Sequence, residues 1–395
     1  MRLKAVNKLK DKIAIVGLGW TKFSRNSGVS VQNLALESCK NAIDDAGLTV
    51  KDVDGIATYN IGDAVSPYVV ATGLGLPELR WNIEYFAGAN GATSTLLTAA
   101  CAVIGGLADT VLVFRAMNGR TGTRLGGAGL SLNTSGVEQY CVPYGLTTFP
   151  QAVAMIARRH MIKYGTTSRQ MGAIAVTCRD NAILNERAVL RSPLSIEDHQ
   201  NSKMIVDPLR LYDCCQETDG ACAVLITSAD RAKNLRHAPV YLMSGTHGAG
   251  WRSGEFFGKT TAFWPEWDEL SETYARTMAS ELFGNAGITP KDVDVAELYD
   301  CFTIEPIVQL EDFGFCKKGE GGAFVESGAI KRDGDLPMNT HGGLLSEGYI
   351  HGFNHVLEAA SQLRGDAGAR QIKDAEIALV AGYCGPAANA VILRR

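Results

Sequence analysis

The stretches AGLTVKDVDGIATY (46–59) and AGITPKDVDVAELY (286–299) are two copies of one sequence unit. They are offset by 240 positions, and eight of their fourteen residues are identical. Each copy follows a segment, 31–45 in the first half and 273–285 in the second, whose apolar residues recur at spacings of three and four. That spacing is typical of an amphipathic helix. The chain therefore contains one supersecondary unit twice.

The segments that follow the two copies also correspond. Residues 88–114 contain a Gly-rich turn, a long helical pattern and a buried strand, and the same order recurs in 348–382. Short strands alternating with longer helices favour a mixed sheet between layers of helices. We therefore predict a duplicated α/β fold with halves at 1–235 and 236–395. Residues from about 115 to 210 have no second copy, so we expect an inserted loop region with helices there, of the kind that often carries substrate contacts.

Composition excludes several classes of protein. The 395 residues include 38 basic and 42 acidic side chains, so no general positive field is available to hold nucleic acid. No run of about 18 apolar residues is present, and the N-terminus lacks a signal-peptide pattern, so neither a membrane span nor export is expected. The ten cysteines are scattered, which fits a reducing cytoplasm better than a disulfide framework.

Five segments carry a family resemblance that runs almost end to end. They are IAIVGLGWTKFSR (13–25), DCCQETDGACAVLITS (213–228), ELYDCF (297–302), NTHGGLLSEGYIHG (339–352) and GYCGPAANAVIL (382–393). In this order they resemble the thiolase superfamily, in particular its sterol-carrier-protein-X-type branch and the steroid side-chain aldolases related to it. The resemblance implies a thiolase-like duplicated αβαβα sandwich with an inserted loop region.

Three positions depart from the pattern of a thiolase. A thiolase needs a nucleophilic cysteine at the start of the long first-half helix, where the helix dipole favours a thiolate. Counting without gaps puts that position at Ala89, and the nearest cysteine, Cys101, lies about three helical turns further along, where we expect it in the core. Tyr349 replaces the histidine of the G-H-P-x-G block, and Tyr299 replaces the histidine of H-D-C-F.

Loss of these three groups in otherwise intact motifs indicates a site rebuilt for other chemistry. The aldolase branch implies a retro-aldol reaction on a β-hydroxyacyl-CoA, with a steroid side chain as the expected acyl group. That reaction needs a base for the β-hydroxyl proton, donors for the enolate oxygen and an acid for carbon, but no covalent acyl-enzyme. We expect Tyr349 to take or relay the hydroxyl proton and Tyr299 to act as its partner. A simple packing role is the alternative for both tyrosines.

Other candidate site residues lie beside these tyrosines in the sequence. Cys301 corresponds to the acid/base thiol of H-D-C-F and is either a retained proton donor or an inherited loop residue. Cys384 stands where other thiolases place an acid/base cysteine, in an altered turn, and ranks below Cys301. His341 precedes two glycines in a loop that the family places beside the catalytic pocket, where it could tune a tyrosine or contact the thioester. No histidine pair has convincing metal-ligand spacing, so no metal is predicted.

Coenzyme A is implied by the resemblance as part of the substrate, with no tightly bound cofactor. The segment SGTHGAG (244–250) lies where the family lines the pantetheine tunnel, which makes His247 and Gly248 candidate contacts, and Gly343 is a third. Neither this segment nor GLGW (17–20) is a phosphate-binding loop. Basic residues of the insertion, such as Arg120 and Arg124, could meet the phosphates or could be solvated loop charges.

The resemblance also implies partners. Thiolase-type subunits dimerise through their core sheets, so we expect a homodimer core. The aldolase branch is associated with a small zinc-ribbon/OB-fold subunit that would complete the coenzyme A site in an α2β2 complex. Two other functions stay open from the sequence: a thiolase or acyltransferase acting through a misaligned cysteine, and a non-catalytic lipid- or CoA-binding protein that keeps only the frame.

Overall fold

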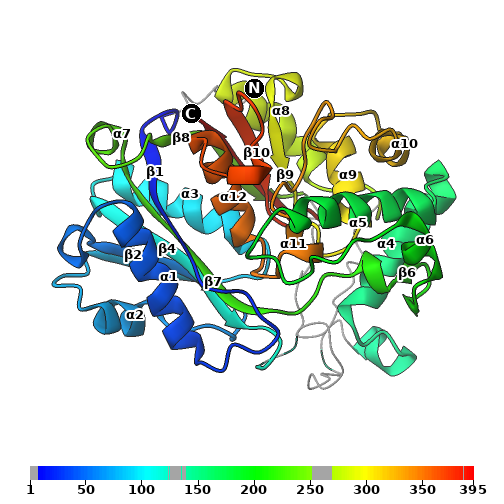
Figure 1. Cartoon of the computed structure of the whole chain (residues 1–395), viewed down its shortest axis with the longest axis horizontal. Helices are drawn as coiled ribbons and strands as arrows, with labels where there is room; N and C mark the ends of the chain where they lie inside the picture. The colour runs from blue at the N-terminus through cyan, green and yellow to red at the C-terminus, as the bar shows by residue number, and fades with distance from the viewer. Residues whose placement is uncertain (1–7, 123, 125–134, 136–138, 251–268, 386) are drawn as a thin grey trace.

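A nine-stranded mixed sheet runs through the molecule in this computed structural model, which describes residues 8–122, 124, 135, 139–250, 269–385 and 387–395 (Figure 1). From one edge to the other, its strands are β3 (Trp81–Phe86), β2 (Gly55–Asn60), β4 (Thr110–Asn118), β7 (Asp219–Ser228), β1 (Ile13–Trp20), β8 (Val240–Ala249), β11 (Ala387–Arg394), β10 (Ile377–Ala381) and β9 (Val295–Glu297). The five strands on one side come from the first half of the chain and the four on the other side from the second half.

The two groups of strands meet only where β1 and β8 pair. Two residue pairs join them, Ala14 with Tyr241 and Ile15 with Val240, whereas β1 and β7 pair over most of their length. Because this junction is narrow, each half of the chain has its own half-sheet. Along the chain, β7 ends at Ser228 and β8 begins at Val240, so the change from one half-sheet to the other falls between these residues.

Helices cover both faces of each half-sheet. Between the half-sheets lie α3 (Gly91–Ile104) and α12 (Phe353–Arg364), which contact each other and strands of both halves. The outer faces are covered by α1 (Val31–Asp45) in the first half and α8 (Ala275–Ala286) in the second. Alternate residues of one strand point to opposite faces. Accordingly, Val111 of β4 belongs to the central core and Leu112 to the core under α1. The predicted five-layer αβαβα sandwich is confirmed.

The sequence repeat forms the same turn in both halves. Gly47 and Gly287 follow α1 and α8 with φ of 71° and 76°, the left-handed region that glycine tolerates best. The short 3₁₀ helices η1 (Val50–Asp52) and η5 (Pro290–Asp292) come next, and each begins with a capping box between a threonine and an aspartate three residues later. The repeat therefore encodes a helix end, a capped turn and the strand that follows.

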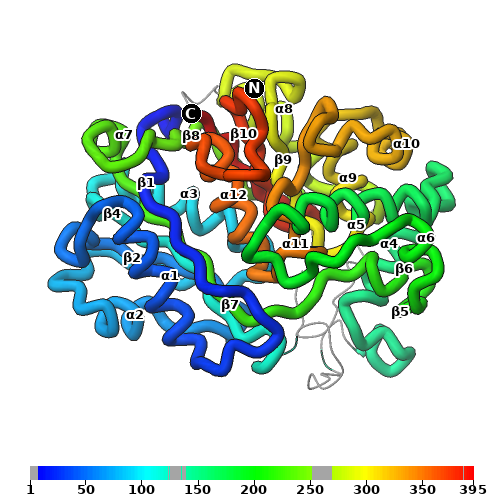
Figure 2. Tube along the Cα trace, in the orientation of Figure 1, coloured from blue at the N-terminus to red at the C-terminus, as the bar shows by residue number. Residues whose placement is uncertain are grey.

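The predicted insertion is an excursion between β4 and β7, residues 119–218. Its described part contains η3 (Val142–Tyr144), α4 (Phe149–Tyr164), α5 (Ser168–Ile183), α6 (Ile196–Asn201), the two-stranded sheet of β5 (Met204–Val206) and β6 (Leu209–Arg210), and η4 (Leu211–Asp213). In Figure 2 this green segment lies against the yellow and orange part of the second half. There α5 contacts α9 (Ile304–Asp312), α10 (Gly321–Glu326) and α11 (Gly343–Ser346).

The remaining short helices are α2 (Pro67–Leu74), α7 (Ala229–Ala232) and η6 (Gly368–Arg370). Within the described ranges, no helix is long and apolar enough to cross a membrane.

The expectation that Cys101 belongs to the core is wrong. Cys101 is exposed near the C-terminal end of α3. The first two turns of α3 are buried almost all round, but its last turn alternates between buried and outward-facing residues, and Ile104 is 42% exposed. Helical periodicity shows which residues share a face, but not which end of a helix leaves the core.

Candidate active site

Tyr299 and Tyr349 form a hydrogen-bonded phenol pair, with 2.8 Å between their hydroxyl oxygens. Tyr299 follows the end of β9, and Tyr349 lies in the loop between α11 and α12. Tyr299 is buried, whereas Tyr349 is only half-buried, so Tyr349 is the more exposed phenol of the pair. Burial raises the pKa of both phenols well above the usual value near 10. Both phenols are therefore protonated at neutral pH.

The Tyr349 loop is fixed through its backbone. The Tyr349 N–H donates to Thr218 Oγ1 (3.1 Å), and Glu217 forms a parallel β-bridge with Tyr349, at the end of the excursion. The Asn354 amide, in the first turn of α12, donates to the Gly348 carbonyl (3.2 Å). Segments from both halves therefore position the Tyr349 phenol.

His351 packs edge-on against the Tyr349 ring, with 5.0 Å between ring centroids. Its Nδ1 lies 2.8 Å from a guanidinium nitrogen of Arg115, a fully buried arginine of β4 that is also paired with Asp63. Burial and the neighbouring Arg115 charge lower the pKa of His351 to about 3, so its ring is neutral. Because Arg115 can only donate, Nδ1 accepts and the ring proton is on Nε2.

Cys301 and Glu305 form a second polar pair beside the tyrosines. The Cys301 thiol donates to Glu305 Oε2 (3.2 Å), and the Cys301 carbonyl accepts from the Cys215 N–H (2.9 Å). Both side chains are buried, and burial raises the pKa of the thiol well above 9 and that of the Glu305 carboxyl to about 8. The site therefore holds a neutral thiol next to a carboxyl that exchanges protons near neutral pH. Glu305 was not among the residues predicted from the sequence, although its spacing of four from Cys301 at a helix start is a usable signal.

Ala89 lies just before the N-terminus of α3, the place where the family resemblance puts a nucleophilic cysteine. Its carbonyl accepts from the Tyr383 N–H (3.4 Å), so it faces the turn that carries Cys384. The Cys384 thiol is buried and donates to the Gly382 carbonyl (3.3 Å), and burial raises its pKa well above 9. Neither Cys301 nor Cys384 has the lowered pKa of a reactive thiolate.

His341 lies in a buried ionic network, and among the described residues its side chain's hydrogen bonds, ion pairs and ring contact go to groups other than the tyrosine pair. Its ring is 4.9 Å from that of His355, and Glu297 is near both, with Oε2 3.6 Å from His341 Nδ1 and 3.4 Å from His355 Nδ1. Burial alone would lower the pKa of His355, but bonds to Asp300 and Glu297 raise it to about 9. His355 is therefore an imidazolium between two carboxylates.

Glu297, His341 and His355 are close enough together to hold a metal ion. The donor set fits one poorly, however. His341 Nδ1 already accepts from the Gly343 N–H (3.0 Å), and the charged His355 ring supplies the positive charge that the carboxylates need. We therefore describe this group as an ion-paired support for the loop that leads to Tyr349.

The three candidate CoA contacts lie in two places. His247 and Gly248 are near the end of β8, where His247 is exposed, and a Cβ on Gly248 would come within 2.9 Å of the Tyr274 ring. Gly343 is buried, and a Cβ there would clash with the Asp300 carboxylate at 1.9 Å. Gly343 thus has a packing reason to be glycine, while His247 is accessible to a ligand.

Arg120 and Arg124 are partly exposed and both pair with Glu217, the residue that bridges to Tyr349. They therefore lie at the edge of the tyrosine site, although their charge is partly used by Glu217.

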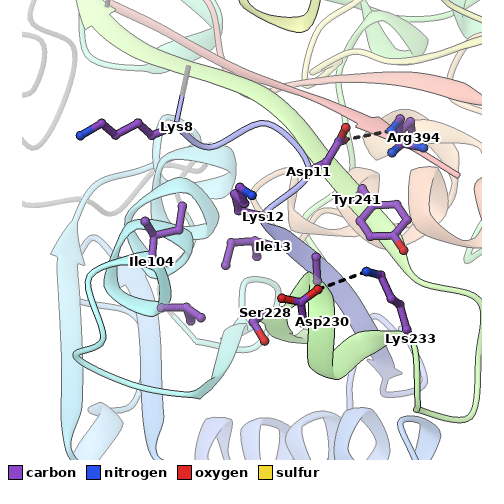
Figure 3. A pocket seen from close by; sticks show the side chains of 12 residues that line it. Lys8, Asp11, Lys12, Ile13, Ile104, Ser228, Asp230, Lys233, Tyr241 and Arg394 are labelled. Carbon is purple, nitrogen blue, oxygen red and sulfur yellow. Dashed lines mark hydrogen bonds and ion pairs between the residues drawn. The ribbon is translucent and has the colours of Figure 1, made fainter. Parts of the chain in front are cut away.

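A cavity of about 570 Å³ lies elsewhere, between the start of β1, the end of α3 and α7 (Figure 3). Four of its charged residues form two ion pairs within it, Lys233 with Asp230 (3.1 Å) and Arg394 with Asp11 (2.9 Å). None of the tyrosine-site residues lines it.

The chain is similar to known proteins along almost its whole length. Residues 259–394 match the thiolase C-terminal domain-like family. The chain is 42% identical to 17-hydroxy-3-oxo-4-pregnene-20-carboxyl-CoA lyase of Mycobacterium tuberculosis, over 98% of this chain and all of that protein. It is 40% identical to a steroid side-chain-cleaving aldolase of Thermomonospora curvata, over 98% of each chain. A solved structure of an Ltp2-ChsH2(DUF35) aldolase superposes with a TM-score of 0.90, 39% identity and 99% coverage of each chain.

Tyr299, Tyr349 and Ala89 thus set this thiolase-like frame apart from the thiolase pattern at the three positions noted in the sequence. The chain belongs to the thiolase-like family that includes the steroid side-chain-cleaving lyases, and it is 29% identical to sterol carrier protein 2 of Bos taurus over 94% of this chain.

Proposed function

We propose that this protein is a carbon–carbon lyase that cleaves a β-hydroxyacyl-CoA by a retro-aldol reaction. The Tyr299–Tyr349 pair carries the proposal, because it puts two proton-bearing oxygens 2.8 Å apart where a thiolase has imidazoles. Ala89 stands at the nucleophile position, and the thiols of Cys301 and Cys384 are protonated. These residues support proton transfer and enolate stabilisation rather than acyl transfer.

The substrate that we propose is a steroid side-chain CoA thioester. In the substrate named for the Mycobacterium tuberculosis relative, the 17-hydroxyl is on the β-carbon of a thioester attached at carbon 20. Breaking the bond between carbons 17 and 20 would give a steroid ketone and a three-carbon acyl-CoA. The coenzyme A is part of the substrate, and the reaction as proposed uses no tightly bound cofactor.

In the proposed reaction, the β-hydroxyl approaches Tyr349 from the accessible side of the pair. Since neither phenol is ionised, Tyr349 can accept this proton only as its own moves on to Tyr299 and Tyr299 in turn releases one to a base beyond the pair. The electrons of the broken Cα–Cβ bond form the thioester enolate, which then takes a proton at Cα. His351, neutral and with its proton on Nε2, fixes the edge of the Tyr349 ring.

We also propose an assembly and a location. The β3 edge of the sheet is open and Phe86 at its end is 75% exposed, which supports a homodimer through the core sheets. The Ltp2-ChsH2(DUF35) aldolase is named for two components, which supports a small zinc-ribbon/OB-fold partner in an α2β2 complex that completes the coenzyme A site. The ten free cysteines support a cytoplasmic location.

Mass spectrometry of products tests the function. The chain, co-expressed with its small partner, is incubated with a panel of β-hydroxyacyl-CoA thioesters that includes a 17-hydroxy steroid. We expect a ketone and a shortened acyl-CoA in equal amounts. Transfer of radiolabel from an acyl-CoA to the protein as a stable thioester would instead show a thiolase. Binding of the thioester without products would show a carrier.

A further inference from the structure

Glu305 is a buried carboxyl for which the proposed reaction has so far no use. It is 6% exposed, and its Oε2 accepts from the Cys301 thiol (3.2 Å) and the Phe302 N–H (3.3 Å). Its Oε1 is buried without a hydrogen-bond partner, and no cation pairs with Glu305 within the described residues. A buried, half-used carboxyl costs stability, so a structural role alone does not explain it.

The retro-aldol reaction needs a place to keep one proton. The β-hydroxyl loses a proton before the bond breaks, and Cα gains one afterwards. A protonated phenol pair can pass this proton along but cannot hold it, because each phenol already carries its own. The relay must therefore end on a group that gains and loses a proton near neutral pH.

Glu305 is the group at this site that meets the requirement. Burial raises its carboxyl pKa to about 8, within reach of the working pH. Burial raises the pKa of the Tyr299, Tyr349 and Tyr383 phenols well above 10 and that of the Cys301 and Cys384 thiols well above 9, so these groups keep their protons at the pH where Glu305 exchanges its own. The groups that face Glu305 are Asp300 and Cys301 on its own segment, Tyr299 after β9, Cys215 after η4, Tyr349 before α12, and Tyr383 and Cys384 between β10 and β11.

We infer that Glu305 is the proton store of the reaction, receiving the β-hydroxyl proton by way of the Tyr349–Tyr299 pair and returning it to Cα by way of Cys301. The inference rests on the proposed retro-aldol function. It gives Cys301 the role of the acid that touches the substrate carbon. Glu305 acts through Cys301 and is a positioning and proton-storing residue.

The steps balance. The β-hydroxyl O–H bond breaks, its proton goes to Tyr349, and one proton leaves the phenol pair for the Glu305 carboxylate. The oxygen's electron pair forms the ketone C=O, and the electrons of the Cα–Cβ bond form the enolate. The enolate then takes the Cys301 thiol proton at Cα, and Glu305 returns its proton to the thiolate across the 3.2 Å contact. The carboxylate is regenerated and no oxidant or reductant is needed.

The pH profile of kcat/KM tests the inference on the full chain with its partner. For the wild type, we expect kcat/KM to rise about tenfold per pH unit up to about pH 8 and then to level off. Glu305→Gln, which keeps the shape of the side chain, should lose at least about 100-fold and show no rise. The matched control is Glu311→Gln on the same helix, a buried carboxyl paired with His160 and Lys318, which should keep the rise. Thermal melting checks that each variant is folded.

Hydrogen–deuterium exchange at Cα gives a readout that does not depend on bond cleavage, because the short acyl-CoA product can be supplied directly. In D₂O the wild type should exchange deuterium into Cα of this product, and Glu305→Gln and Cys301→Ala should slow the exchange at least about tenfold. An unchanged rise of kcat/KM in Glu305→Gln, or exchange at the wild-type rate, would overturn the role of Glu305. Failure of the wild type to cleave any thioester at any pH would instead overturn the proposed function.

Discussion

The hydroxyl of Tyr349 is the single group on which the proposed chemistry depends most directly, and Tyr349→Phe removes it alone. We expect turnover to fall by about 10²- to 10³-fold, because a positioned proton-transfer group contributes about that much. Stability should fall by only about 1–3 kcal/mol, since the buried Tyr299 hydroxyl loses its partner. Steady-state kinetics and denaturant titration measure the two effects. Tyr144→Phe, at an 85% exposed position, is the control, and near-wild-type turnover of Tyr349→Phe would refute the hypothesis.

The charge on His355 should make the free energy of unfolding, rather than the catalytic rate, depend on pH. Its pKa is about 9 when folded, against an ordinary value near 6.5, so its contribution is full below about pH 6.5 and is lost as the pH rises through 9. Between these values the free energy of unfolding should fall by up to about 1.4 kcal/mol per pH unit.

His355→Gln should remove that slope and cost about 3–5 kcal/mol at pH 6.5, because Glu297 and Asp300 lose the cation between them. Chemical denaturation from pH 6 to pH 9.5 checks both statements. A slope that persists in the variant would place the titrating group elsewhere.

Among the elements, strand β3 is the one from which the proposed dimer interface can be tested most directly. It is the open edge of the sheet, whereas the other edge, β9, is partly covered by a bridge between Ala296 and Met338. An open edge is a ready surface for pairing with a second chain. Phe86→Lys should therefore give a monomer of about 42 kDa by light scattering, whereas we expect the wild type to be a dimer. Tyr68→Lys, 63% exposed on the nearby α2, should stay dimeric, and a dimeric Phe86→Lys would show that β3 is not the interface.

The repeat made the elements predictable because each copy contains its own turn chemistry. Gly47 and Thr49 specify the end of α1 and the capped turn without help from distant residues, and the second half repeats them. The contacts between elements that are far apart in the sequence are harder to predict from it. Arg115 and His351 are 236 residues apart, and their contact depends on how β4 meets the α12 loop. The exposure of Cys101 is hard to predict for the same reason, since it depends on where α3 leaves the core.

Some site residues can likewise be predicted from the sequence, and others become evident only in the structure. Tyr299 and Tyr349 stood out because they replace specific histidines in motifs that are otherwise kept. Glu305 carries no such mark, because a glutamate in the first turn of a helix is common and stabilising in its own right. Only its burial, its contact with Cys301 and its free Oε1 give it a role.

At the scale of the whole molecule, the proposed partner decides whether the chain works alone. The chain supplies the phenol pair, but Arg120 and Arg124, the basic residues described at the edge of this site, already pair with Glu217 and are only partly available to coenzyme A phosphates. A second subunit that supplies phosphate contacts should therefore lower KM for the thioester at least about tenfold and change kcat less, because such contacts bind ground and transition states alike. Titration of the purified chain with the small subunit, with light scattering for the α2β2 mass, measures this. Full activity of the chain alone, with an unchanged KM when the subunit is added, would show that this chain forms the coenzyme A site by itself.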